Sequence, residues 1–139
     1  MNARTPLPTL FEALCTHARL QPGKTALRDS RRTLSYLQWQ ARSLALAQSL
    51  LGLGLQPGDR VALLAYNRVE WWELYAGLAA AGLVAVPVNF RLAAPEIAYI
   101  VEHSGAAAFV AQQSLVDRVE AIRADMPIPP ERFIVCLLY

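Results

Sequence analysis

Few groups of residues in this chain have the types and spacing that chemistry requires. Gly23-Lys24-Thr25 resembles the end of a phosphate-binding loop, but that motif needs a glycine where the chain has Ala18. Gly52-x-Gly54, followed by Gly58, imitates a dinucleotide-binding fingerprint. It follows an expected helix, however, whereas the fingerprint joins a strand to the start of a helix. We therefore interpret both stretches as turns.

The titratable side chains give no catalytic arrangement either. Glu70 and Glu73 are spaced to lie on one helical face. Glu70 fits the first turn of a helix capped by Asn67, and Glu73 fits a solvated position. His17 and His103 have no Cys, Asp or Glu at metal-ligand spacing, and no serine lies in a Gly-x-Ser-x-Gly elbow. The sequence thus indicates no catalytic, cofactor-binding or metal-binding residue.

Asn89 and Arg91 lie together after an expected buried strand, in the stretch VAVPVNFRL over residues 84–92. Pro87 ends the strand because proline cannot extend the hydrogen-bond ladder. Asn89 suits a turn, since its side chain binds nearby backbone. We expect Arg91 to hold this loop by donating to a neighbouring carboxylate or carbonyl. A scaffold role for both residues is favoured over contact with a substrate.

Composition indicates one well-packed domain. Of the 139 residues, 55% are hydrophobic and 17% are charged, which excludes disorder, and the net charge of +2 is too small to indicate nucleic acid. Residues 74–88 are uncharged but shorter than the ~18–20 residues of a membrane span, and the N-terminus lacks the apolar core of a secretory signal. We expect a cytoplasmic protein in which Cys15 and Cys136 are free thiols, with a disulfide as the less favoured alternative.

Helices and strands alternate from residue 35 onwards. Ser35 and Gln38 fit a capping box at the start of the first helix of this alternation. Apolar residues recur on one face of that helix, which predicts an amphipathic helix; they are Leu37, Ala41, Leu44 and Leu51. The expected helices cover residues 35–52, 67–82, 96–104 and 114–125, and the expected strands cover residues 60–65, 84–88, 106–111 and 132–138. With a short hairpin over residues 25–34, this order predicts an α/β fold: a parallel, doubly wound sheet flanked by helices.

Six stretches carry a family resemblance. They are TLSY (33–36), LGLQPGDRVA (53–62), NRVEW (67–71), AGLVAVPVNFRL (81–92), EIAYI (96–100) and SGA (104–106). In this order and spacing they resemble the start of an AMP-dependent synthetase, the family of adenylate-forming acyl-CoA synthetases and their relatives. The NFRL variant is most similar to the fatty-acyl and aryl-acid CoA ligase branches.

The resemblance implies a two-step ligase. A carboxylic acid and ATP, with Mg²⁺, give an acyl-adenylate, and coenzyme A then displaces AMP. The family's motifs for this reaction are a Ser/Thr/Gly-rich loop ending in Gly-x-Pro-Lys, an acidic residue on the ribose and a lysine from a mobile C-terminal domain. The chain contains no such loop, and Lys24, its only lysine, matches no catalytic position. We therefore expect residues 1–139 to be an incomplete N-terminal part of an AMP-binding domain, a scaffold segment that is inactive alone.

Two other interpretations stay open. One is a non-enzymatic interaction or oligomerisation module, and the other is an independent small-molecule-binding α/β domain. The expected strand over residues 132–138 is apolar and has nothing after it to cover its edge. We expect the apolar patch at this edge to cause self-association or association with the remainder of a full enzyme.

Overall fold

The structure is a computed structural model that describes residues 7–136. Its centre is a parallel sheet of β3 (Arg60–Leu64), β4 (Val84–Pro87), β5 (Ala108–Gln112) and β6 (Phe133–Cys136), in the order β4-β3-β5-β6. A separate antiparallel hairpin consists of β1 (Thr25–Arg28) and β2 (Thr33–Ser35). The predicted α/β class, parallel sheet and short hairpin are confirmed.

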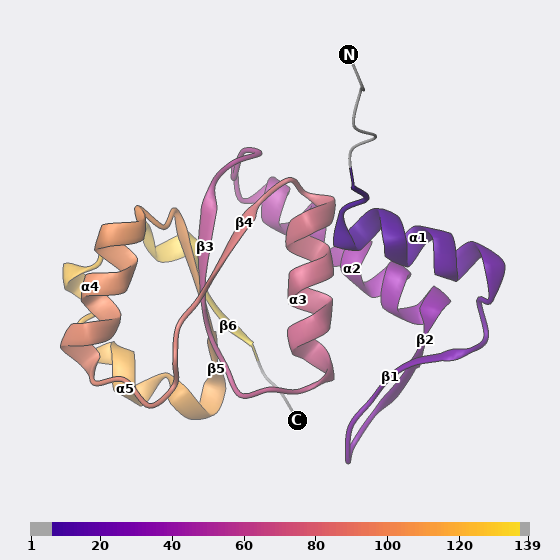
Figure 1. Cartoon of the computed structure of the whole chain (residues 1–139). Helices are drawn as coiled ribbons and strands as arrows, with labels where there is room; N and C mark the ends of the chain where they lie inside the picture. The colour runs from indigo at the N-terminus through magenta and orange to yellow at the C-terminus, as the bar shows by residue number, and fades with distance from the viewer. Residues whose placement is uncertain (1–6, 137–139) are drawn as a thin grey trace.

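Helices cover both faces of the sheet (Figure 1). α2 (Tyr36–Gly52) and α3 (Val69–Ala80) lie on one side, and α4 (Ala94–Ser104) and the short α5 (Asp117–Glu120) lie on the other. α1 (Leu10–Leu20) packs outside the first layer against α2 and α3. None of the described helices is both long and apolar enough to cross a membrane.

The two central strands divide their side chains between two cores, because neighbouring residues of a strand point to opposite faces. Val61 and Leu63 of β3 pack with α2 and α3, whereas Ala62 and Leu64 pack with α4 and α5. β5 alternates in the same way, and all five of its residues are buried. The near-continuous apolar strands of the sequence are therefore explained by burial on both faces.

Most element boundaries agree with the prediction to within a few residues. The capping box at the start of α2 is confirmed, since the Ser35 hydroxyl accepts from Gln38 N at 3.2 Å and Gln38 accepts from Ser35 N at 2.9 Å. Gly105 ends α4 with a left-handed backbone, φ 62°. β6 covers only part of the strand predicted over residues 132–138, of which 137 and 138 lie outside the described residues.

The single helix predicted over residues 114–125 is wrong. The chain forms a 3₁₀ turn (Gln113–Leu115), then α5, then a second 3₁₀ turn (Arg123–Asp125), and a third 3₁₀ turn (Pro130–Arg132) precedes β6. Backbone hydrogen bonds between residues three apart, such as Ile122 N to Val119 O at 3.0 Å, tighten the turns beyond α5. Tertiary packing determines the conformation of this segment, since Val119, Met126 and Ile128 are all buried in the same core.

The predicted cap of α3 by Asn67 is also wrong. The N-cap residue is Arg68, and the Arg68 side chain makes no capping hydrogen bond to the start of the helix. The first helical N–H, that of Val69, donates instead to Asp29 Oδ2 at 3.1 Å. Asp29 lies in the hairpin turn, where its Oδ1 also accepts from the backbone N–H of Arg31 and Arg32, each at 2.8 Å. One carboxylate thus joins the hairpin to the start of α3.

The apolar face predicted for α2 is not its buried face. The buried residues are Trp39, Ser43, Ala47 and Leu50, and the leucines at 37, 44 and 51 are exposed. α2 crosses close to α3 at Gly77, where an added Cβ would lie 2.8 Å from Leu46 Cδ2 and 3.1 Å from the Ser43 carbonyl. The absence of a side chain at Gly77 therefore allows the Ser43 backbone and the Leu46 side chain of α2 to approach α3 closely.

Candidate functional site

A cavity of about 410 Å³ opens at the carboxyl ends of β3, β5 and β6. From β3 the chain runs to β4 on one side and then returns to place β5 on the other side. β3 and β5 therefore flank the point at which the strand order reverses, and open α/β sheets bind their ligands in the crevice at such a point. This position makes the cavity the candidate functional site.

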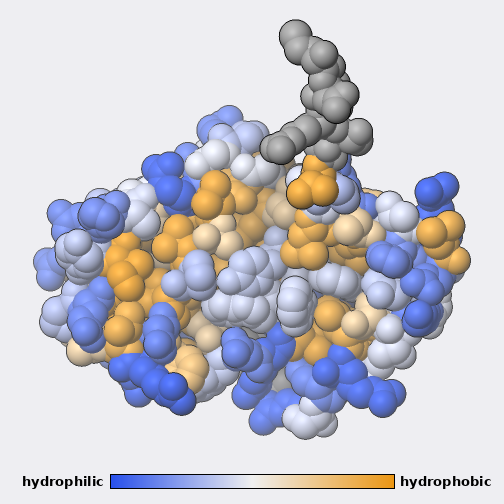
Figure 2. All heavy atoms as spheres, viewed as in Figure 1, coloured by the Kyte–Doolittle hydropathy of each residue, from blue (hydrophilic) through white to orange (hydrophobic). Residues whose placement is uncertain are grey.

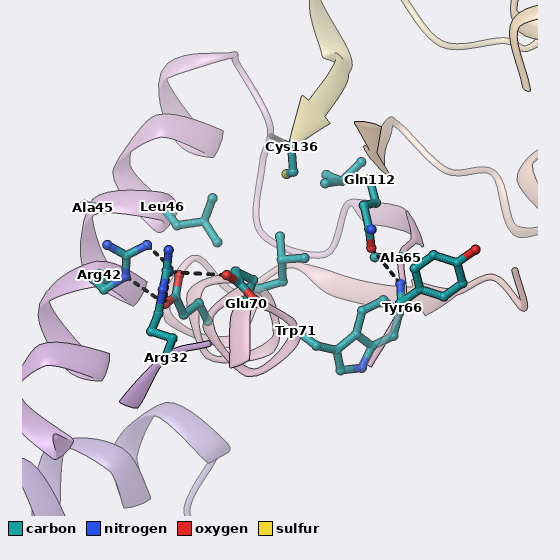
Figure 3. Close-up of a pocket in the computed structure, with 13 residues that line it drawn as sticks. Arg32, Arg42, Ala45, Leu46, Ala65, Tyr66, Glu70, Trp71, Gln112 and Cys136 are labelled. Carbon is teal, nitrogen blue, oxygen red and sulfur yellow. Dashed lines mark hydrogen bonds and ion pairs between the residues drawn. The ribbon is translucent and has the colours of Figure 1, made fainter. Parts of the chain in front are cut away.

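Sheet and helices each contribute one wall of the cavity (Figure 3). Ala65 and Tyr66 after β3, Gln112 at the end of β5 and Cys136 at the end of β6 form the sheet wall. α2 and α3 form the other wall; their lining residues are Arg42, Ala45, Leu46, Glu70, Trp71, Glu73 and Leu74, to which the hairpin adds Arg32.

Two arginines and two glutamates form an ion cluster in this second wall. Glu73, only 8% exposed, accepts from Arg42 through both oxygens: Nε to Oε1 at 2.7 Å and Nη2 to Oε2 at 3.0 Å. Arg32 Nη1 lies 3.5 Å from Glu73 Oε1 and 3.4 Å from Glu70 Oε1. The bidentate bond to Glu73 raises the pKa of Arg42. The positive and negative charges of the cluster balance each other.

The cluster corrects two predictions. Glu73 is buried and paired rather than solvated, and Glu70 faces Arg32 rather than taking part in a cap. Glu70 Oε2 is buried and has no hydrogen-bond partner among the described residues. No local pattern indicates these contacts, because Arg42 and Glu73 are separated by 31 residues and meet only when α2 packs on α3.

The sheet wall holds a satisfied polar bridge and a thiol. The buried Gln112 accepts from Tyr66 N–H at 3.0 Å and donates to Ser114 Oγ at 2.8 Å, which joins the ends of β3 and β5. Burial raises the pKa of the Cys136 thiol, and the nearby Glu70 carboxylate raises this pKa further. A protonated thiol is a poor nucleophile, so this environment disfavours Cys136 as a nucleophile. Cys15 and Cys136 are both free thiols, as expected.

The residues of the cavity do not fit ATP phosphates or their Mg²⁺. Phosphate binding needs uncommitted positive charge, and both arginines face glutamates. Mg²⁺ needs free oxygen ligands, and within residues 7–136 no three His, Cys, Asp or Glu side chains gather as metal ligands. Lys24 is exposed and lies outside the cavity lining. The arrangement can order the packing of α2, α3 and the hairpin, and it can accept a hydrogen-bond donor at Glu70.

Asn89 and Arg91, which follow β4, lie outside the cavity lining. Asn89 Oδ1 accepts from Arg91 N–H at 3.0 Å, which confirms the predicted turn. The predicted contact of Arg91 is wrong: its guanidinium lies over the Phe90 ring, 5.3 Å from the centroid. Arg118 holds the loop instead, since its Nη1 donates to the Phe90 carbonyl at 2.9 Å.

The histidines stand apart from the cavity and from each other. His17 stacks on Tyr36 with ring centroids 5.0 Å apart, and His103 stacks on Tyr99 at 5.3 Å. His17 Nδ1 also lies 3.0 Å from Gln21 Nε2. Neither histidine belongs to a group of three or more potential metal ligands within residues 7–136. Both histidines are exposed and stack on a neighbouring tyrosine at the surface.

Comparison with known proteins places these features in a family. The model of the AMP-binding enzyme family matches residues 14–137. A fatty acid–[acyl-carrier-protein] ligase of Streptomyces coeruleorubidus is 37% identical over 131 residues, which are 94% of this chain and 24% of the ligase. A long-chain-fatty-acid–CoA ligase of Mycobacterium tuberculosis is 42% identical over 96 residues, 69% of this chain and 19% of that enzyme.

A solved structure agrees with these matches. The fatty acyl CoA synthetase of Mycobacterium tuberculosis superposes with a TM-score of 0.84 at 34% identity, over 92% of this chain and 26% of that one. The chain thus spans about a quarter or less of the length of these three relatives. It also matches a shorter protein of Mycobacterium tuberculosis, Rv1549, at 31% identity over 131 residues, which are 93% of this chain and 72% of that protein. Family model, sequence relatives and structure all agree with the predicted resemblance: the chain belongs to the AMP-binding enzyme family.

Proposed function

We propose that residues 1–139 form an incomplete N-terminal part of an AMP-binding domain and act as a scaffold segment of an ATP-dependent ligase. The reaction of the complete enzyme would join a fatty or aryl carboxylic acid to coenzyme A or to a carrier protein through an acyl-adenylate. The names of the matched relatives, a fatty-acid carrier-protein ligase and a fatty-acid CoA ligase, support this substrate class.

The charge balance of the cavity supports the scaffold role. Arg42 on α2 is hydrogen-bonded to Glu73 on α3, and Gln112 on β5 is hydrogen-bonded to Tyr66 and Ser114. Arg32 Nη1 has no hydrogen-bond partner within residues 7–136, but it lies 3.4 Å from Glu70 and 3.5 Å from Glu73. These contacts hold elements together and leave no cationic site for a triphosphate. ATP, Mg²⁺ and coenzyme A would therefore bind through residues of the remaining part of the enzyme.

The remaining part has two sites of attachment in this proposal. One is the free edge of β6, which pairs only with β5 in the described chain and could accept a further strand. The other is the mouth of the cavity, where Glu70 Oε2 has no hydrogen-bond partner within residues 7–136. The free thiols Cys15 and Cys136 fit the reducing cytoplasm, where we expect the protein to work.

Pyrophosphate exchange tests this function. We expect the purified 139-residue chain to give background exchange with ATP, Mg²⁺ and a panel of fatty and aryl acids, because no group in its cavity stabilises the charge of the reacting phosphates. A complete fatty-acid ligase of the same family serves as the positive control. Exchange that depends on both ATP and a carboxylic acid would contradict the proposal.

A second candidate function is binding of a small molecule by the chain alone. The cavity volume of about 410 Å³, its position at the reversal of strand order and the unpartnered Glu70 oxygen favour it. Thermal unfolding in the presence of ATP, AMP, coenzyme A and fatty acids distinguishes the two functions. A rise in melting temperature that Glu70→Gln abolishes would support the binding domain, and unchanged melting with every compound would reject it for these ligands.

A further inference from the structure

α2 exposes an apolar stripe that nothing in the described chain covers. Leu37, Leu44 and Leu51 are 53%, 41% and 42% exposed. They lie seven residues apart, and the exposed Ala41 and Gln48 fall between them, so that the positions alternate in steps of four and three residues. This spacing places all five on one seam of the helix, as in helices that pair with another helix.

The same face of α2 carries almost no charge. A helix that faces water normally presents charged side chains on its outer side. Within Tyr36–Gly52 the only charged residue is Arg42, and its guanidinium is bound to Glu73. The other exposed positions beside the leucines are neutral; they are Gln38, Ala45, Gln48 and Ser49. Covering this face would therefore bury leucine surface without leaving an unpaired charge or bringing like charges together.

The stripe is symmetric about its middle residue. Leu37 precedes Leu44 by seven residues, and Leu51 follows it by seven. When two such helices pack antiparallel around a two-fold axis at Leu44, Leu37 of each copy meets Leu51 of the other, and the two Leu44 side chains meet at the axis. Self-complementarity of this kind is what a two-fold interface between identical subunits requires.

We propose that the outer face of α2 is the interface of a homodimer, in which the two α2 helices pack antiparallel through Leu37, Leu44 and Leu51. The seam is roughly 21 Å long at about 1.5 Å of rise per residue. An interface of this length is small, so the dimer forms at high protein concentration and dissociates on dilution. The proposal does not depend on the proposed function.

The competing route to self-association is the free edge of β6. Val135 in that strand is 37% exposed, and the backbone of the edge offers unpaired hydrogen-bonding groups. The two routes use different kinds of contact. Association through α2 depends on side-chain packing between helices, and association through β6 depends on backbone hydrogen bonds between strands. Substitutions in α2 and in β6 therefore separate them.

Sedimentation velocity of the 139-residue chain over a wide concentration range tests the proposal. We expect a concentration-dependent dimer that Leu44→Glu shifts to monomer, and that Leu37→Glu weakens in the same direction. Leu20→Glu, at a leucine of α1 that is 68% exposed, and Val135→Lys in β6 are matched controls that leave the dimer unchanged. Circular dichroism and the melting temperature verify that each variant is folded.

Disulfide cross-linking tests the antiparallel geometry. In a chain whose Cys15 and Cys136 are replaced by alanine, Leu44→Cys alone should give a covalent dimer on oxidation. A mixture of Leu37→Cys and Leu51→Cys chains should give the mixed dimer in preference to either like pair. Three results would overturn the proposal: a wild-type chain that is monomeric at every concentration, a dimer that survives Leu44→Glu, or cross-links between like positions 37 and 37 or 51 and 51.

Discussion

The two faces of the sheet are built differently. The core under α4 and α5 is apolar throughout, and in it Phe109 stacks on Phe133 with ring centroids 5.0 Å apart and an interplanar angle of 7°. The buried polar or charged residues among residues 7–136 are Ser43, Glu73 and Gln112, on α2, on α3 and at the end of β5. Glu73 and Gln112 line the cavity.

This difference separates stability from the capacity to interact. The core under the α4/α5 face excludes water by close packing of apolar side chains. The α2/α3 face ends in paired charges, an unpartnered Glu70 oxygen and a 410 Å³ cavity, and its outer side carries the leucine stripe of α2. Figure 2 shows the viewed surface, where hydrophobic residues lie in several groups separated by hydrophilic ones.

The largest expected effect is on the apolar face. Phe109 is fully buried, so Phe109→Ala removes its packing against Phe133 and leaves a cavity. We expect a loss of about 3–5 kcal/mol in the free energy of unfolding, measured by urea denaturation. Tyr99→Ala is the matched control, because Tyr99 on α4 is 63% exposed. Equal losses for the two variants would show that the α4/α5 core is not closed as described.

A smaller effect is expected for the ion cluster. Glu73→Ala removes the carboxylate that binds Arg42 and faces Arg32. Both arginine side chains are partly exposed, at 48% and 36%, and can turn to water, so we expect a loss of about 1–3 kcal/mol in the free energy of unfolding. Glu70→Ala should cost less, since only one oxygen of Glu70 faces a cation. A larger loss for Glu70→Ala would reverse the roles of the two glutamates.

The smallest effect concerns the cap of α3 and has a defined pH dependence. Asp29→Asn should lower the urea midpoint at neutral pH, whereas Asn67→Ala should leave it almost unchanged, because Asp29 accepts from Val69 N–H. Backbone N–H groups, that of Arg31 first, lower the pKa of Asp29, with a further contribution from the Arg68 charge. The stabilisation is therefore present above the ordinary aspartate pKa of about 3.9 and is lost as the pH falls through the lowered pKa of the folded state.

The measurement compares urea midpoints of wild type and Asp29→Asn between neutral pH and pH about 2. The difference should shrink as the pH falls through the acidic end of this range. A difference that is constant with pH would exclude the ionised carboxylate as the cap, and a large effect of Asn67→Ala would return the cap to that residue.

The sequence by itself determined the fold class, the alternation of elements and the family. Burial on both faces makes β3 and β5 continuous apolar runs, and turns and caps depend on neighbouring residues, as in the Ser35–Gln38 box and the glycine end of α4. Such features depend on contacts within a few residues, so they can be read along the chain.

Only the tertiary structure decided which face of α2 is buried, what caps α3 and where Glu73 is directed. The close approach of α2 to α3 at Gly77 places Ser43 and Leu46 of α2 against α3, and the hairpin brings Asp29 to a helix start 40 residues away in sequence. Arg42 and Glu73 meet through the same packing. Contacts between distant segments depend on how whole elements pack, and local patterns do not encode that arrangement.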